Sequence, residues 1–191
     1  MKKMKDLEKK IQFVVNLYKS KKFDKAEQQA KKLIYSNPKT VFLYNILGLI
    51  LNEQNKIDEA IKIYEKGIKI QPDYSMIYNN LGSAYKNKED YAKSEIYYKK
   101  SIELNNTIPE PQNNLGNLYQ DLNKYEKAID CYKKAISINP KFFVSHYNLG
   151  IAYKIIGEFN EAKKYLYEAI KLNPHFFTAH RTLSQLTKYT K

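Results

Sequence analysis

Three asparagines, Asn80, Asn114 and Asn148, are separated by intervals of 34 residues, and their type and spacing suit them to a recognition role. An asparagine amide both donates and accepts hydrogen bonds, so a row of amides can bind the N–H and C=O groups of an extended polypeptide without reading its side chains. Asparagine is common in this chain, and the alternative is that the three amides serve local helix packing.

The residue types that usually carry catalysis or bind metals do not form a comparable pattern. Cys131 is the only cysteine, so the chain forms no internal disulfide and no thiolate metal site. His146 and His180 occupy the position that Tyr44 and Tyr78 hold 34-residue intervals earlier, which indicates packing residues rather than ligands. The sequence also lacks a glycine-rich phosphate loop and a serine triad. We therefore expect no enzyme activity, no metal and no cofactor.

The 34-residue interval extends over the whole chain and is not broken by an insertion. Three features recur at this interval: an Asn-Pro pair or its equivalent, a glycine and a small residue. The second residues of the pairs are Pro38, Pro72, Asn106, Pro140 and Pro174; the glycines are Gly48, Gly82, Gly116 and Gly150; the small residues are Ala26, Ala60, Ser94, Ala128 and Ala162.

Each repeat is predicted to form two helices. Tyr78, Leu81, Gly82 and Tyr85 are spaced at i, i+3, i+4 and i+7, so they share one face of the first helix. A glycine inside a helix costs about 1 kcal/mol relative to alanine. Glycine at one position of four repeats therefore indicates that a neighbouring helix approaches too closely for a Cβ. The proline ends the second helix.

The combination of Tyr-x-x-Leu-Gly-x-x-Tyr, a small residue, an aromatic such as Tyr64, Tyr98 or Tyr132, and a final proline resembles the tetratricopeptide repeat. The resemblance implies an all-α, right-handed α-solenoid (superhelix) of antiparallel helix pairs, with about eleven helices. We expect one domain, 1–191, with repeats at about 7–40, 41–74, 75–108, 109–142 and 143–176 and a capping helix at 177–191. The pattern departs from the family at Val14, Asn106 and Ser184, which replace Gly, Pro and Gly.

The resemblance also implies that the first helices line a concave groove that binds a protein or peptide. An asparagine ladder of this kind resembles the one in the repeats of protein O-GlcNAc transferases. The candidate peptide-binding residues are Asn80, Asn114, Asn148, Asn79, Asn113, Asn117, Lys86, Tyr147 and Arg181. A second candidate is an apolar patch for a partner or for self-association, formed by Ile11, Val15, Phe42, Ile46 and Leu49.

The formal net charge of +13 is compatible with nucleic acid, an anionic membrane or an acidic partner. The lysines gather late in the second helices, on the predicted outer face, whereas the predicted groove mixes both signs of charge. Nucleic acid is therefore disfavoured as the groove ligand. No segment approaches the roughly 20 apolar residues of a membrane span, and the N-terminal apolar run is too short for a signal peptide. We expect a cytoplasmic protein that does not contact membranes.

Three functional hypotheses follow from these patterns. The favoured one is a scaffold that holds an extended polypeptide in the groove. The second is the substrate-recruiting N-terminal arm of a larger enzyme, such as a sulfotransferase or a glycosyltransferase. The third is a self-assembling scaffold, in which the apolar patch of one chain binds another copy and forms a homo-oligomer.

Overall fold

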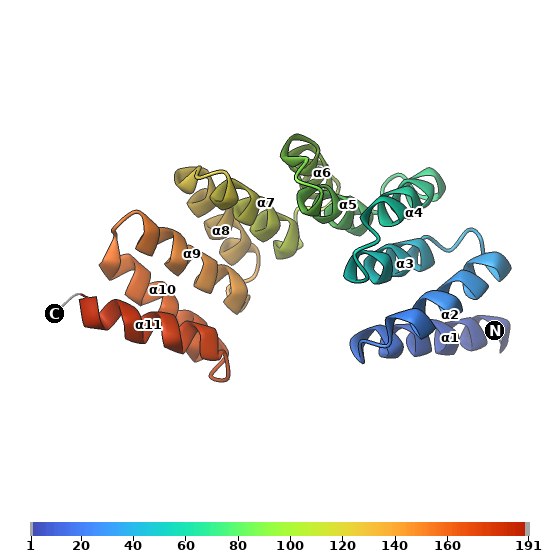
Figure 1. Ribbon diagram of the computed structural model, residues 1–191, viewed down its shortest axis with the longest axis horizontal. Coiled ribbons are helices and arrows are strands. Elements are labelled where there is room, and N and C mark those ends of the chain that lie inside the picture. Colours follow the sequence, from blue (N-terminus) through green and yellow to red (C-terminus); the bar gives the residue numbers. More distant parts are fainter. Residues whose placement is uncertain (1, 190–191) are drawn as a thin grey trace. The chain divides into compact units, whose positions relative to one another are not determined.

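The computed structural model describes residues 2–189 and the side chains of residues 6–187, and all regular secondary structure in this range is helical (Figure 1). The eleven helices are α1 (Lys2–Lys19), α2 (Phe23–Ser36), α3 (Val41–Glu53), α4 (Ile57–Ile70), α5 (Ser75–Asn87), α6 (Tyr91–Leu104), α7 (Pro109–Asp121), α8 (Tyr125–Ile138), α9 (Phe143–Ile155), α10 (Phe159–Leu172) and α11 (Phe177–Tyr189). The predicted all-α architecture of helix pairs is confirmed.

The chain folds as two compact units, Met1–Leu104 with α1 to α6 and Asn105–Lys191 with α7 to α11. Within each unit, the two helices of a pair pack against each other, and the second helix of a pair packs against the first helix of the next. First helices also contact one another directly: α3 contacts α1 and α5, and α7 contacts α9. The first helices of a unit therefore form one layer, and the second helices form another.

The turn inside each helix pair contains one residue in the left-handed conformation, again every 34 residues. These residues are Lys21, Asn55, Glu89, Asn123 and Gly157, with φ between 56° and 87°. In the second pair, the Lys56 N–H donates to the Leu51 carbonyl at 2.9 Å and the Asn55 N–H donates to the Asn52 carbonyl at 3.0 Å. This is the Schellman closure, and the other four turns repeat it. Only Gly157 adopts this conformation without steric cost.

The regular spacing of the glycines has a direct cause, because each one lies against a side chain of its own second helix. A Cβ at Gly82 would lie 2.7 Å from the Tyr98 ring, and a Cβ at Gly116 would lie 2.5 Å from the Tyr132 ring. Gly48 is placed against Tyr64 in the same way. The expected close approach is confirmed, and in these three repeats the group that approaches is an aromatic ring lying over the glycine.

A second recurring contact fixes the start of the first helices. The hydroxyl groups of Tyr44 and Tyr78 donate to the carbonyls of Pro38 and Pro72, each at 2.9 Å. In the last two first helices, Nε2 of His146 and His180 makes the same contact with Pro140 and Pro174 at 2.9 Å. A carbonyl only accepts, so each ring donates from Nε2. The prediction that His146 is a packing residue is confirmed, since it is buried, whereas His180 is exposed.

The three rings that cover glycines differ in what their hydroxyl groups bind. The Tyr98 hydroxyl lies 3.0 Å from Ser83 Oγ, and the Tyr132 hydroxyl donates to Asn117 Oδ1 at 2.8 Å. In the second repeat, the position equivalent to Ser83 and Asn117 is occupied by Leu49, whose side chain cannot form a hydrogen bond. The Tyr64 hydroxyl is consequently buried without a partner among the described residues, and burial raises the pKa of this phenol.

The Tyr132 and Tyr64 sites predict different responses of the stability to the loss of the hydroxyl oxygen. Tyr132→Phe should lower the free energy of unfolding by about 1 kcal/mol, because it leaves Asn117 with one bond fewer. Tyr64→Phe should leave the stability unchanged or raise it, because it removes an unsatisfied buried group. Denaturant titration of both variants measures the difference. A larger loss for Tyr64→Phe than for Tyr132→Phe would contradict this assignment.

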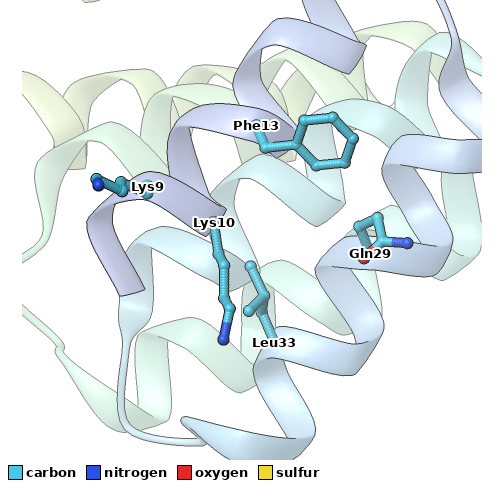
Figure 2. A pocket seen from close by; sticks show the side chains of 5 residues that line it. All are labelled: Lys9, Lys10, Phe13, Gln29 and Leu33. Atoms are coloured by element: carbon cyan, nitrogen blue, oxygen red, sulfur yellow. The ribbon is translucent and has the colours of Figure 1, made fainter. Parts of the chain in front are cut away.

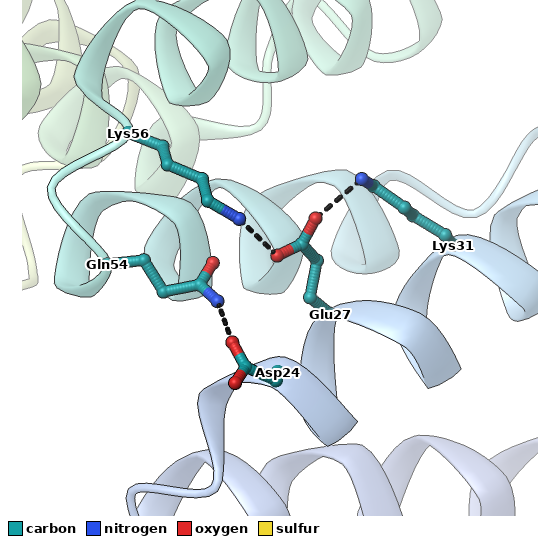
Figure 3. A network of polar contacts seen from close by, with 5 residues as sticks. All are labelled: Asp24, Glu27, Lys31, Gln54 and Lys56. Carbon is teal, nitrogen blue, oxygen red and sulfur yellow. Dashed lines mark hydrogen bonds and ion pairs between the residues drawn. The ribbon is translucent and has the colours of Figure 1, made fainter.

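A network of polar side chains ties α2 to the turn between α3 and α4 (Figure 3). The carboxylate of Glu27 contacts Lys31 Nζ at 2.5 Å and Lys56 Nζ at 2.8 Å, and Gln54 Nε2 donates to Asp24 Oδ1 at 2.8 Å. Burial raises the pKa of Glu27, but the bonds from the two lysines outweigh it and lower this pKa to about 2. The two repeats are therefore joined by an ion pair that requires a charged carboxylate.

Glu27 should contribute to stability in a pH-dependent manner. Its pKa is lower in the folded chain, so its contribution is full above about pH 4.5 and is lost as the pH falls towards 2. Glu27→Gln should cost about 1 kcal/mol at pH 7, since solvent screens the two partly exposed lysines. The gap between the unfolding free energies of wild type and variant should close between pH 4.5 and 2. Glu126→Gln, an exposed position on α8, is the control; an equal effect there would refute the prediction.

Candidate functional site

Side-chain amides of neighbouring first helices bond to one another in the second unit. Asn148 on α9 donates from Nδ2 to the Oδ1 atoms of Asn113 and Asn117 on α7, each at 3.0 Å. Ser145 Oγ donates to Asn113 Oδ1 at 2.9 Å, and the Tyr132 hydroxyl donates to Asn117 Oδ1 at 2.8 Å. Two helices of the first layer and one helix of the second layer are thus joined through these amides.

The network determines which amide atoms are already bonded within the protein and which are left for a ligand. Both Oδ1 atoms on α7 accept two bonds each, and the Asn148 Nδ2 makes two bonds, which is its full capacity. These bonds leave over the NH₂ of Asn113, which is buried, and the Asn117 NH₂ and the Asn148 Oδ1, which belong to two partly exposed side chains. One donor and one acceptor on adjacent helices match the C=O and N–H groups of a peptide backbone.

In the first unit the amides are less accessible. Asn80 Nδ2 donates to Asn45 Oδ1 at 2.8 Å, Asn79 Nδ2 donates to Asn80 Oδ1 at 3.3 Å, and all three side chains are buried. Closer to the turn, Asn87 Nδ2 donates to Asn52 Oδ1 at 3.2 Å on the exposed surface. Asn80 therefore bridges α3 and α5, and a ligand would reach it only after displacing its neighbours.

The remaining candidate peptide-binding residues have different surroundings. Asn114 on α7 and Lys86 on α5 are partly exposed, and Arg181 on α11 is exposed. Asn113 is buried beneath Asn148 and supports it rather than facing outward. The Tyr147 ring packs edge-on against Phe176 with centroids 4.9 Å apart, so it forms part of the apolar packing of the second unit.

The predicted apolar patch is not exposed at Ile46, so the prediction is wrong for this residue. Ile46 is only 5% exposed, and Val15, Phe42 and Leu49 pack partly against the core of the first unit. Ile11 is also partly buried. The physical reason is that α1 and α3 contact each other directly, so the apolar side chains of two neighbouring first helices cover one another.

Sequence reasoning missed the partners of the asparagines. Three of the observed amide bonds join residues 35 apart, Asn45–Asn80, Asn52–Asn87 and Asn113–Asn148, and a fourth joins Asn117 and Asn148, which are 31 apart. The bonded amides of neighbouring first helices are therefore not the residues that are equivalent in the 34-residue register. A search for amides at an interval of 35 would have found Asn45 and Asn52.

The described residues contain no group of three or more His, Cys, Asp or Glu side chains placed to bind a metal ion. Cys131 is a buried cysteine. Among the helices described, none combines the length and the apolar character required to cross a bilayer.

Comparison with known families agrees with the geometry of the helix pairs. Residues 109–142, 143–176 and 77–108 match the family described as tetratricopeptide repeat, and residues 48–88 match the one described as TPR repeat. The chain belongs to the tetratricopeptide repeat family. Repeats of this family generally mediate protein–protein interaction.

Solved structures similar to this TPR chain share its fold. The thermophilic TPR protein TTC0263 of Thermus thermophilus is 17% identical, with a TM-score of 0.82 over 95% of this chain and 98% of the other. MamA is 26% identical, with a TM-score of 0.68 over 83% and 93%. YrrB, described as a TPR protein with an unusual peptide-binding site, is 18% identical, with a TM-score of 0.64 over 91% and 89%. No curated protein sequence matches the chain.

Proposed function

We propose that this TPR protein is a scaffold that holds an extended polypeptide against the groove face of its first helices. The observation that carries the proposal is that the network leaves the Asn117 NH₂ and the Asn148 Oδ1 over, as a pair on two partly exposed side chains of neighbouring first helices. Such a pair binds the backbone of a peptide and leaves its side chains free to contact the residues around it.

The network below the pair prepares it for binding. Tyr132 and Asn148 both donate to Asn117 Oδ1, so the orientation of the Asn117 amide is set before a ligand arrives. Groups that are already ordered lose little conformational entropy on binding, and more of the interaction free energy remains as affinity. Val144 and Ile151 lie one turn before and after Asn148 and are partly exposed, which supplies apolar contacts for ligand side chains.

The charge of the surrounding surface favours a polypeptide over nucleic acid. On the groove face of the second unit, Glu110 and Asp121 on α7 are exposed, while α9 contributes Lys154. A phosphate backbone requires a continuous row of cations, and its binding weakens steeply with salt. The mixed charges here instead suit a ligand whose main-chain groups are neutral.

The proposal predicts that removal of the two amides weakens peptide binding. A random 12-residue peptide library displayed on phage would be selected against the full chain, and the affinity of the best peptides measured by calorimetry. Asn117→Ala combined with Asn148→Ala should weaken binding by about 2 kcal/mol, or about thirtyfold, at about 1 kcal/mol for each lost hydrogen bond.

Asn160→Ala, an exposed amide on the second helix α10, is the matched control and should leave the affinity unchanged. Circular dichroism establishes that each variant keeps its helical content. Peptides that bind the double variant as tightly as the wild type would refute the role of the pair, and a library that yields no binder would refute the peptide-binding proposal itself.

A further inference from the structure

One face of the first helix pair surrounds a hollow of about 230 Å³ (Figure 2). Lys9, Lys10 and Phe13 line it from α1, and Gln29 and Leu33 line it from α2. Phe13 is 54% exposed. It is two residues from both Ile11 and Val15, and two residues correspond to about 200° around a helix. The hollow therefore lies on the side of α1 opposite Ile11 and Val15.

The 34-residue spacing identifies the residues of other repeats that are equivalent to those around the hollow. The residues equivalent to Phe13 are Leu47, Leu81, Leu115, Leu149 and Leu183, all at most 9% exposed. Those equivalent to Lys9 include Leu43 and Ile77, which are fully buried. The face around Phe13 therefore corresponds to the surface that, in other repeats, is buried against the preceding repeat.

At four junctions inside the two units this face is covered by the second helix of the preceding repeat. α2 packs on α3, α4 on α5, α8 on α9 and α10 on α11. At the junction of α4 and α5, Gly67 lies directly against Ile77, since a Cβ at Gly67 would collide with the Ile77 side chain. Within the described residues, the equivalent face of α1 and α2 carries no such helix.

The residues of the hollow indicate which kind of helix fits. If this face contacted only water, we would expect a polar residue in place of Phe13, because exposing a large aromatic side chain next to Leu33 to water is unfavourable. Lys9 and Lys10 stand where the second and third repeats have apolar or aromatic residues. Lys10 pairs with Asp6 at 2.6 Å, so Lys9 is the lysine that gives the rim of the hollow its positive charge. With a net charge of +13, a second copy of the chain is electrostatically disfavoured, and an acidic partner is favoured.

We propose that the hollow of α1 and α2 is a docking site for an acidic amphipathic helix of a partner protein. The helix lies as α4 lies on α5, places an apolar side chain against Phe13 and Leu33, and directs a carboxylate to Lys9. Docking of this kind extends the stack of helices by one member and does not involve the asparagines of the groove.

The test uses the chain's own junction as a probe. A cross-linked helical peptide with the sequence of α4, residues Ile57–Ile70, is prepared with Gly67→Glu and with Gly67→Lys, because residue 67 of a helix docked in this way meets Lys9. Each peptide is titrated into the full chain at low salt. We expect the Glu peptide to bind about tenfold more tightly than the Lys peptide, because opposite charges attract across the interface.

Two variants of the full chain locate the site. Phe13→Ser should weaken binding of the Glu peptide about tenfold, because the peptide loses an aromatic anchor. The melting temperature of the chain should not change, because the Phe13 ring is exposed. Lys9→Glu should reverse the preference, so that the Lys peptide binds better. Lys134→Glu, an exposed residue on α8 with the same change of charge, should leave the preference as it is in the wild type.

The proposal is overturned if neither peptide binds, if both bind equally, or if Phe13→Ser leaves the affinity unchanged. It is also overturned if light scattering over a concentration series shows that the chain self-associates and that Phe13→Ser abolishes this association. A second copy would then be the occupant of the hollow.

Discussion

The contact between a glycine of the first helix and an aromatic ring of the second governs the rest of this structure. Gly116 lacks a Cβ, so the Tyr132 ring lies over the backbone of α7, and its hydroxyl emerges beside Asn117. That hydroxyl orients Asn117, which in turn receives a bond from Asn148 on the next first helix. The packing of the core and the orientation of the candidate site are therefore consequences of one missing methyl group.

Much of the fold could be predicted from the sequence because each position is sampled five times. The glycines, the small residues and the prolines all appear in one register, so the helix pairs and the close approach at Gly82 follow from spacing alone. The left-handed turns could not be predicted in the same way. Lys21 and Glu89 carry no local signal for positive φ, and the conformation is imposed by the closing hydrogen bonds of two packed helices.

The candidate site was predicted less completely, for a related reason. Spacing reveals which residues are equivalent, but it does not reveal which residues touch. Asn80 and Asn148 are equivalent in sequence, yet Asn80 is buried against Asn45 whereas Asn148 stays partly exposed. The burial of Ile46 has the same origin, because the contact of α1 with α3 depends on the distance between neighbouring first helices, which the repeat pattern does not specify.

The five closed turns restrict how a protein of this kind can change its length. Each turn consists of a few residues whose backbone is fixed by the closing hydrogen bonds, so an extra residue would break these bonds. One residue inserted within a helix would rotate everything after it by about 100° and carry the glycine away from its ring. Growth or shortening therefore has a natural unit of one whole repeat, and duplication of 34 residues is the smallest change in length that keeps every contact in place.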